Sequence, residues 1–181
     1  MQLAVKNIIL LIFTVTLLVS CNNGESLQKY FVDNQESGNF ISIDLPVSIM
    51  KVDESKLTDT QKEAYSSVKK LNFLGFKKDS TNVETFNAEL LKVKAILKNK
   101  QYNDLMEFND KNAKVVVKYI GNDDYADEFV VFASSKDMGF GIVRILGNHM
   151  SPEKMVTLAN AMKNSDIDES QLGGIMDFFN K

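Results

Sequence analysis

Residues 102–146, YNDLMEFNDKNAKVVVKYIGNDDYADEFVVFASSKDMGFGIVRIL, decide the fold because they carry four strand signals in succession. The four stretches are rich in β-branched and aromatic residues, and they are residues 102–108, 113–120, 128–134 and 139–146. The segments between them hold Asn, Asp, Gly and Ser, which are typical of turns. Links this short join neighbouring antiparallel strands, so the sequence predicts a four-strand meander.

The chain before the meander carries further helix and strand signals. Residues 27–36 predict a short helix, which Gly38 ends. Residues 39–46, NFISIDLP, alternate between two sets of side chains and predict a strand that stops at Pro46. Residues 71–77, LNFLGFK, predict another strand.

Two capping-box spacings mark the starts of longer helices. Residues 58–61, TDTQ, predict a helix whose apolar face is formed by Ala64, Tyr65, Val68 and Leu71. Residues 81–84, TNVE, predict a second helix whose apolar stripe is formed by Phe86, Leu90, Val93 and Leu97. The C-terminal half of this helix complements the negative end of the helix dipole with Lys92, Lys94, Lys98 and Lys100.

Two helices are expected after the meander. Ser151 and Pro152 suit the N-cap and first position of a helix. Residues 169–180 predict a last short helix, which Gly173 and Gly174 weaken. The pattern as a whole predicts an α+β fold, in which an antiparallel sheet with the C-terminal meander carries helices packed on one face. Residues 27–181 are expected to form this single domain.

The N-terminus reads as a signal peptide. The uninterrupted apolar run covers residues 8–19, whereas a membrane-spanning helix needs roughly 20 apolar residues and a signal-peptide core about 7 to 15. A polar segment, CNNGES, follows directly at residues 21–26. We therefore expect residues 1–20 to be cleaved, with a permanent anchor helix as the less favoured alternative.

Residues 18–21, LVSC, fit the bacterial lipobox, in which cleavage occurs between Ser20 and Cys21. A thiol is the nucleophile that can carry a diacylglycerol thioether, so Cys21 is the predicted lipidation site. Acylation with two or three chains then holds the protein on a membrane, with residues 21–26 as a tether. The alternative is a free cysteine near an ordinary signal cleavage site.

Composition limits the remaining functions. Cys21 is the single cysteine, so no thiol remains for a disulfide or for thiolate chemistry once it is lipidated. The net charge of −3 becomes −4 when Lys6 leaves with the signal peptide, which argues against a nucleic-acid partner. By the sorting rule of enterobacteria, Asn22 after the lipidated cysteine favours the outer membrane. We expect a lipid-anchored protein of the cell envelope that faces the periplasm or the cell surface.

The sequence contains no group of residues with the types and spacing of a catalytic or metal site. His149 is the single histidine and is expected in a solvated turn just past the last strand. Residues 151–154, SPEK, match S-x-x-K, but Ser151 is better explained as a helix cap. Neither a zinc motif nor a phosphate-binding glycine loop occurs, since Gly139 and Gly141 sit inside a strand pattern. No catalytic residue, no metal site and no cofactor are predicted.

Two sets of charged residues leave alternatives open. An acidic cluster lacks the regular spacing and the glycine of a calcium loop, which favours a solvated hairpin turn, and it consists of Asp123, Asp124, Asp127 and Glu128. Arg144, the single arginine, lies mid-strand between apolar residues. We expect Arg144 to point outward and pair with an acid on a neighbouring strand, or to serve as a binding anchor.

The order of these motifs is similar to that of small Bacteroidota lipoproteins of the domain of unknown function 4252 family, over roughly residues 27–163. In that family a Y-x-x-L-M-x-V strand precedes a V-x-I-Y strand, and a strand ending in I-x-G precedes a helix. The matching residues are Tyr102, Leu105, Met106, Val115, Val117, Tyr119, Ile145 and Gly147, while Phe108 stands where an aliphatic residue is expected. The resemblance implies an envelope lipoprotein of undefined activity and brings no active site.

Three functional hypotheses follow. The first is a non-catalytic binding or scaffold domain that presents a sheet face or edge to another envelope protein, with residues 113–120 or 139–146 as the edge. The second is a hydrolase or transferase that acts on envelope polymers through carboxylates such as Asp123 or Glu128. The third is a carrier of apolar ligands, since 44% of the residues are hydrophobic and eight are methionine.

Overall fold

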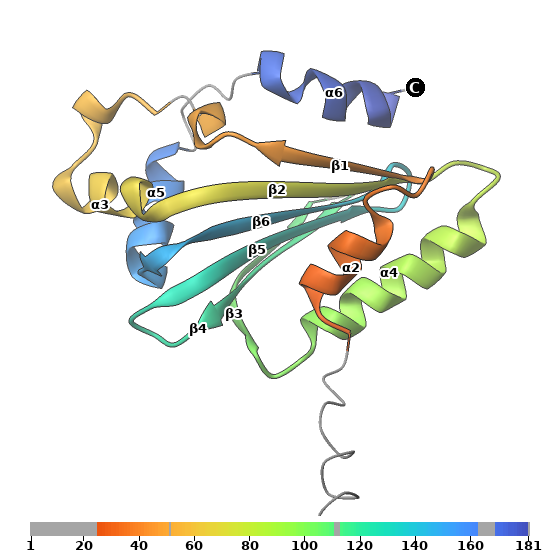
Figure 1. Ribbon diagram of the computed structural model, residues 1–181, viewed down its shortest axis with the longest axis horizontal. Helices are drawn as coiled ribbons and strands as arrows, with labels where there is room; N and C mark the ends of the chain where they lie inside the picture. Colours follow the sequence, from red (N-terminus) through yellow and green to blue (C-terminus); the bar gives the residue numbers. More distant parts are fainter. Residues whose placement is uncertain (1–24, 51, 111–112, 163–168, 181) are drawn as a thin grey trace, which may run out of the picture.

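The computed structural model describes residues 25–50, 52–110, 113–162 and 169–180, and its centre is a six-stranded antiparallel sheet (Figure 1). The strand order is β1-β2-β6-β5-β4-β3. The strands are β1 (Phe40–Leu45), β2 (Val68–Lys77), β3 (Tyr102–Asp110), β4 (Ala113–Gly121), β5 (Ala126–Ser135) and β6 (Gly139–Met150). The predicted meander is confirmed, because β3 to β6 are successive neighbours.

Helices lie on both sides of the sheet (Figure 1). One face is covered by α2 (Leu27–Asn34) and α4 (Val83–Leu97), and α6 (Glu169–Asn180) packs over β1 and β2 on the other face. At one end of the sheet, α3 (Asp59–Ser67) packs against α5 (Pro152–Met162). Two short 3₁₀ helices, Val47–Met50 and Glu54–Lys56, join β1 to α3. The expected α+β class is confirmed, and α6 adds a helix on the second face.

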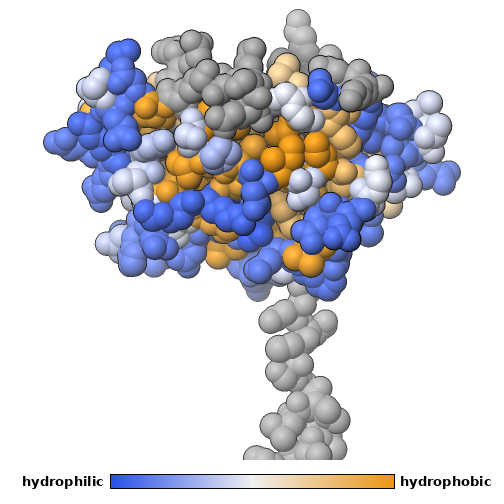
Figure 2. Space-filling view, turned by 45° about the horizontal axis from the view of Figure 1, so that its top comes forward, coloured by the Kyte–Doolittle hydropathy of each residue, from blue (hydrophilic) through white to orange (hydrophobic). Residues whose placement is uncertain are grey.

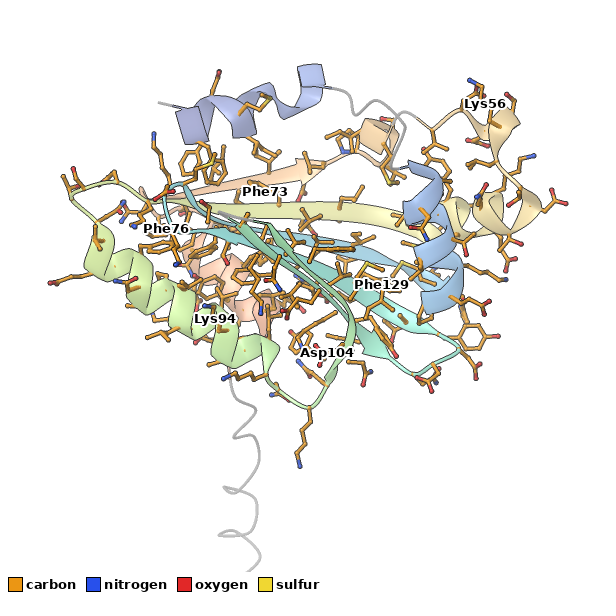
Figure 3. All side chains as sticks on the ribbon, turned by 180° about the vertical axis from the view of Figure 1, so that it is seen from behind. Lys56, Phe73, Phe76, Lys94, Asp104 and Phe129 are labelled. Carbon is orange, nitrogen blue, oxygen red and sulfur yellow. The ribbon has the colours of Figure 1, made fainter. Side chains whose placement is uncertain are left out.

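The sheet divides the core into two hydrophobic clusters. Successive side chains of a strand point to opposite faces, so β2 contributes to both clusters. Leu74 and Phe76 join the cluster under α2 and α4, whereas Leu71 and Phe73 join the cluster on the α6 side. Figure 3 shows Phe73 on the α6 side of the strands and Phe76 nearer α4. The side that carries α6 also shows an apolar band bordered by hydrophilic residues (Figure 2).

Aromatic rings fill the centre of the cluster under α4. The Phe76 ring stacks on Phe140 at a centroid distance of 5.5 Å and meets Phe40 edge-on at 5.0 Å. Phe86 reaches these rings from α4, with its centroid 6.0 Å from that of Phe76. Such pairs contribute about 0.5–1.5 kcal/mol each beyond the burial of their area. This cluster fixes α4 over the sheet.

A buried hydrogen bond joins α2 to α4. The Tyr30 hydroxyl donates to Glu89 Oε2 at 2.8 Å, and Lys92 Nζ donates to Glu89 Oε1 at 2.6 Å. Burial raises the pKa of Tyr30, and the bond to the Glu89 carboxylate raises it further. The buried side chain of Glu89 is therefore satisfied by both neighbours, as a buried carboxylate requires.

The first capping box is confirmed, but its helix is shorter than predicted. Thr58 Oγ1 accepts from the Gln61 backbone N–H, and Gln61 Oε1 accepts from the Thr58 N–H. The helix ends at Ser67, and the predicted apolar-face residues Val68 and Leu71 belong to β2. Val68 is already extended, because pairing with β6 overrides the local helical pattern.

The second predicted capping box is wrong. The N-cap of α4 is Asn82, and its side chain makes no capping bond. Asp79 organises the turn instead, since its Oδ1 accepts from the N–H of Thr81 at 2.7 Å and of Asn82 at 3.1 Å. The Asn82 amide donates back to the Lys77 carbonyl at 2.9 Å. This turn places Lys78 beside the start of α4.

The predicted signal peptide lies outside the described residues, as do Ser20 and Cys21. Within the part of the chain that the structure describes, no helix has the length and apolar character needed to cross a membrane. The first described helix, α2, begins at Leu27 behind the Ser26 N-cap, whose Oγ accepts from the Lys29 N–H at 3.2 Å.

Candidate anion-binding site

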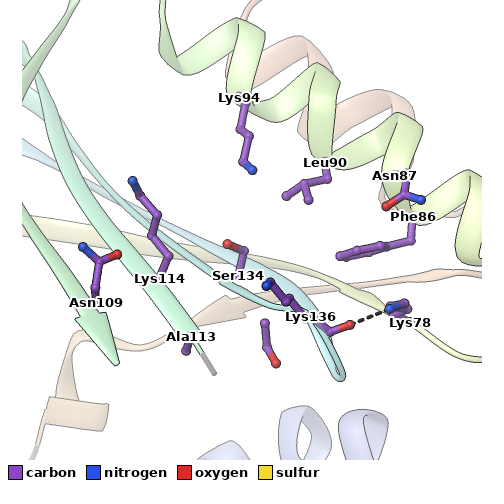
Figure 4. Close-up of a pocket in the computed structure, with 11 residues that line it drawn as sticks. Lys78, Phe86, Asn87, Leu90, Lys94, Asn109, Ala113, Lys114, Ser134 and Lys136 are labelled. Carbon is purple, nitrogen blue, oxygen red and sulfur yellow. Dashed lines mark hydrogen bonds between the residues drawn. The ribbon is translucent and has the colours of Figure 1, made fainter. Parts of the chain in front are cut away.

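A groove of about 490 Å³ opens between α4 and the strand ends of the meander (Figure 4). Its apolar wall is formed by Phe86 and Leu90 of α4. Uncharged hydrogen-bonding side chains complete the lining together with Ala113, and they are Asn87, Asn109, Ser134 and Ser135. We call this hollow the lysine groove because the charged residues described in its lining are all lysines.

Four separate segments of the chain each contribute one lysine to the groove (Figure 4). Lys78 follows β2, Lys94 lies on α4, Lys114 lies on β4, and Lys136 lies in the turn between β5 and β6. The strands and the helix are far apart in sequence, so the tertiary fold assembles this set of ammonium groups.

The lysines of the groove differ in their partners. Lys114 Nζ lies 2.8 Å from Glu107 Oε1, and this bond is the main cause that lowers the pKa of Glu107. Lys78 Nζ donates to the Lys136 carbonyl and stands 5.2 Å from the centroid of the Phe86 ring. Among the residues that the structure describes, no carboxylate forms an ion pair with Lys78, Lys94 or Lys136.

This arrangement fits the binding of an anion. A lysine ammonium offers three donors and no acceptor, so several of them around one hollow attract phosphate or carboxylate oxygens. Among the described residues that line the groove, none is a carboxylate or a histidine. The groove therefore has charge and hydrogen-bond donors for binding, and its lining brings no acid–base pair.

One lysine of the groove belongs to a pattern that is visible in the sequence. Lys94 lies in the lysine-rich half of α4, which the pattern assigns to the helix dipole. Lys78, Lys114 and Lys136 lie in different segments, and only the strand order brings them to one end of the sheet. A run of basic residues along the chain would have signalled the site, but no such run exists here.

Arg144 pairs with an acid on a neighbouring strand, as predicted. Its Nε and one Nη each donate to a Glu128 oxygen at 2.7 Å, and both residues are buried. The guanidinium carbon lies 5.3 Å from the centroid of the Phe31 ring in α2. Arg144 projects from the sheet face, but it is buried there because α2 covers it.

The Arg144–Glu128 pair lies in the lining of a second hollow of about 500 Å³ beside α2. Asp44, Asn72 and Arg144 follow one another across β1, β2 and β6 in the strand register. Lys70 adds an ion pair to Asp44 at 3.0 Å. A role for Arg144 as a binding anchor stays a prediction, since both carboxylate oxygens of Glu128 already engage it.

Asp123 and Glu128, the two carboxylates considered for catalysis, do not converge on one point. Glu128 points to the α2 face, where it binds Arg144. Asp123 Oδ1 accepts from the Tyr119 hydroxyl at 3.2 Å, and Tyr119 pairs with Phe129, whose side chain faces the opposite side of the sheet from Glu128. Burial is the first cause that raises the pKa of Tyr119, and its bond to Asp123 is the second. A paired-carboxylate mechanism through Asp123 and Glu128 has no geometric basis.

His149 and Ser151, the other two residues considered for catalysis, have positions that the secondary structure explains. His149 lies within β6, which continues to Met150 rather than ending before it as predicted. It has a φ of 54°, and its ring meets Tyr125 edge-on at 5.4 Å. Ser151 precedes α5, and its Oγ accepts from the Lys154 N–H at 3.4 Å, as expected of a cap. The described residues hold no group of three or more His, Cys, Asp or Glu side chains that could bind a metal ion.

The sheet edges differ from those expected. Residues 113–120 and 139–146 belong to β4 and β6, which are both paired on two sides. Their proposed role as edges for a partner strand is wrong, because the edges are β1 and β3.

Comparison with known families identifies the domain. A family model described as a domain of unknown function, DUF4252, matches residues 30–158. The chain belongs to the DUF4252 family. The match runs from α2 into α5, so the lysine groove and the Arg144–Glu128 pair both lie inside the DUF4252 domain. No curated protein and no solved structure matches the chain significantly.

Proposed function

We propose that this DUF4252 protein is a lipid-anchored protein of the cell envelope that works by binding rather than by catalysis, with the lysine groove as its binding site for an anionic group. The observation that carries the proposal is the set of Lys78, Lys94 and Lys136 around one groove without a carboxylate partner among the described residues.

The electrostatics of the chain support this assignment. The chain carries 24 acidic residues against 21 basic ones, so a local excess of lysines does not follow from its composition. Ammonium groups that line one groove repel one another, and a bound anion relieves that repulsion. The Lys136 carbonyl and the Phe86 ring hold the Lys78 ammonium in place, so little order is lost when it binds.

Neutralising two groove lysines should weaken anion binding. We expect Lys94→Gln with Lys136→Gln to lower the affinity of the lipid-free mature chain, residues 21–181, for pyrophosphate by about tenfold, since exposed ion pairs contribute up to about 1 kcal/mol each. Isothermal titration calorimetry at low ionic strength measures the dissociation constant, and added salt should weaken binding further.

The matched control is Lys62→Gln with Lys69→Gln, which removes the same charge from exposed lysines near α3. Binding that falls equally in both double variants would mean that net charge alone attracts the anion. Binding that is unchanged in the Lys94 and Lys136 variant would refute the groove as the site.

Cys21 is the proposed anchor. A tether of residues 21–26 spans at most about 20 Å, so it would hold the start of α2 close to the membrane. Replacing Cys21 with Ala should prevent the mass gain of acyl chains, because the thiol that carries the diacylglycerol is absent. Mass spectrometry of the purified protein measures the effect, with Ser26→Ala as the control. A Cys21→Ala variant that still gains acyl chains, or a parent chain that gains none, would refute the anchor.

A further inference from the structure

An apolar notch of about 240 Å³ lies on the opposite face of the sheet from the lysine groove. Its walls include Phe73 of β2 and Phe179 of α6, and Met138 stands at its rim with 52% of its surface exposed. Ala133 and Gly141 are paired across β5 and β6 and also line it. The part of the notch lining that the structure describes carries no charged side chain.

The groove and the notch meet at one end of the sheet. Ala113, Ser134 and Ser135 line both of them. Ser134 pairs with Lys114, whereas Ser135 pairs with Ala113, and neighbouring residues of a strand point to opposite faces. Figure 4 shows α4 on one side of these strand ends and the helix of the other face beneath them. These shared lining residues have small side chains, so the two hollows adjoin at the strand ends.

Small residues also shape the floor of the notch. Gly75 and Gly141 are register partners in β2 and β6, and the Phe73 ring occupies the space where their Cβ atoms would lie. An added Cβ on Gly141 would come within 3.0 Å of that ring. The Phe73 ring therefore packs directly against the backbone of β2 and β6, and Ile175 and Phe179 of α6 belong to the same cluster.

We propose that the two hollows together bind a single amphiphilic anion, with its phosphate or carboxylate head on the groove lysines and its one alkyl chain in the notch. The proposal rests on the anion-binding function proposed above and adds the chemical class of the ligand. Two observations select this occupant: the charge of the groove is complementary to an anionic head, and the notch continues from the groove with an apolar lining. A simple inorganic anion would bind in the lysine groove and leave the notch empty.

The test is a series of ligands that share one head and differ in alkyl length. Inorganic phosphate, butyl phosphate, hexyl phosphate and octyl phosphate are titrated, below the concentration at which they form micelles, into the lipid-free mature chain after its cooperative unfolding has been checked. Full burial of a methylene corresponds to about a fourfold gain in affinity, so an open notch should give about two- to threefold for each CH₂ group.

Two variants locate the alkyl chain. Met138→Gln, at an exposed turn position, should lower the ratio of octyl phosphate to inorganic phosphate affinity about threefold and leave inorganic phosphate unchanged. Leu91→Gln, at an exposed position of α4, is the control and should leave the ratio unchanged.

The outcomes separate the two proposals. Affinity that rises with chain length in the parent chain and falls in Met138→Gln supports the amphiphile site. Phosphate binding with no dependence on chain length overturns the amphiphile proposal and leaves the anion-binding function standing. Absence of binding for every ligand in the series overturns both.

Discussion

Replacing Arg144 with Met should lower the free energy of unfolding by about 3–5 kcal/mol, because it leaves the Glu128 carboxylate buried without its partner. Arg144 donates one hydrogen bond to each carboxylate oxygen of Glu128 and makes a cation–π contact with Phe31, so the substitution removes three interactions together. Urea unfolding followed by far-ultraviolet circular dichroism measures the loss.

The companion experiment removes both charges. The double variant Arg144→Met with Glu128→Leu should be more stable than the Arg144→Met variant, since no buried charge is left unpaired. Lys154→Met, which breaks the more exposed pair to Glu63, is the control and should cost no more than about 1 kcal/mol. An Arg144→Met variant that unfolds like the parent would show that the pair is not buried as described.

Replacing Phe76 with Ala should also cost about 3–5 kcal/mol, because Phe76 is fully buried and contacts Phe40, Phe86 and Phe140. The loss combines the transfer of a ring to water with a cavity that the flanking rings fill only in part. The same urea experiment measures it.

Phe108 provides the matched control for this change. It is also a strand phenylalanine, but 49% of its surface is exposed, so Phe108→Ala should cost about 1 kcal/mol or less. Equal losses at Phe76 and Phe108 would contradict the position of the aromatic cluster between α4 and the sheet.

The meander was predictable because its information is local. Each strand carries its own apolar or aromatic residues, and each turn carries its own Asn, Asp or Gly, so the sequence favours pairing between neighbouring strands. The helix over residues 83–97 was predictable for the same reason, since its apolar stripe repeats at helical spacing. Only its cap was wrong, because Asp79 lies outside the capping-box pattern.

The placement of β2 could not be read from the sequence. Its partners are β1 and β6, and the segment between β2 and β6 includes three strands and a helix. That long-range pairing also explains why Val68 and Leu71 belong to a strand and not to the predicted helix. Arg144 illustrates the same limit, since a partner acid on the next strand was expected but its burial depends on the position of α2.

The lysine groove could not be predicted for the same reason, because it depends on the tertiary fold. Lys78 reaches it because β2 joins the sheet beside β6, and Lys94 reaches it because Phe86 and its neighbours fix α4 over the strands. A lysine in a turn or a strand carries no sign of its spatial neighbours. The site is therefore a consequence of topology rather than of a motif.

A map of backbone amide NMR shifts during titration of the lipid-free mature chain with pyrophosphate tests whether the anion binds in the lysine groove. We expect the shifts to concentrate on residues that line the groove, with Asn87, Ser134 and Lys136 among the largest. Shifts that are spread evenly over exposed lysines, including Lys29 and Lys62 far from the groove in sequence, would contradict it.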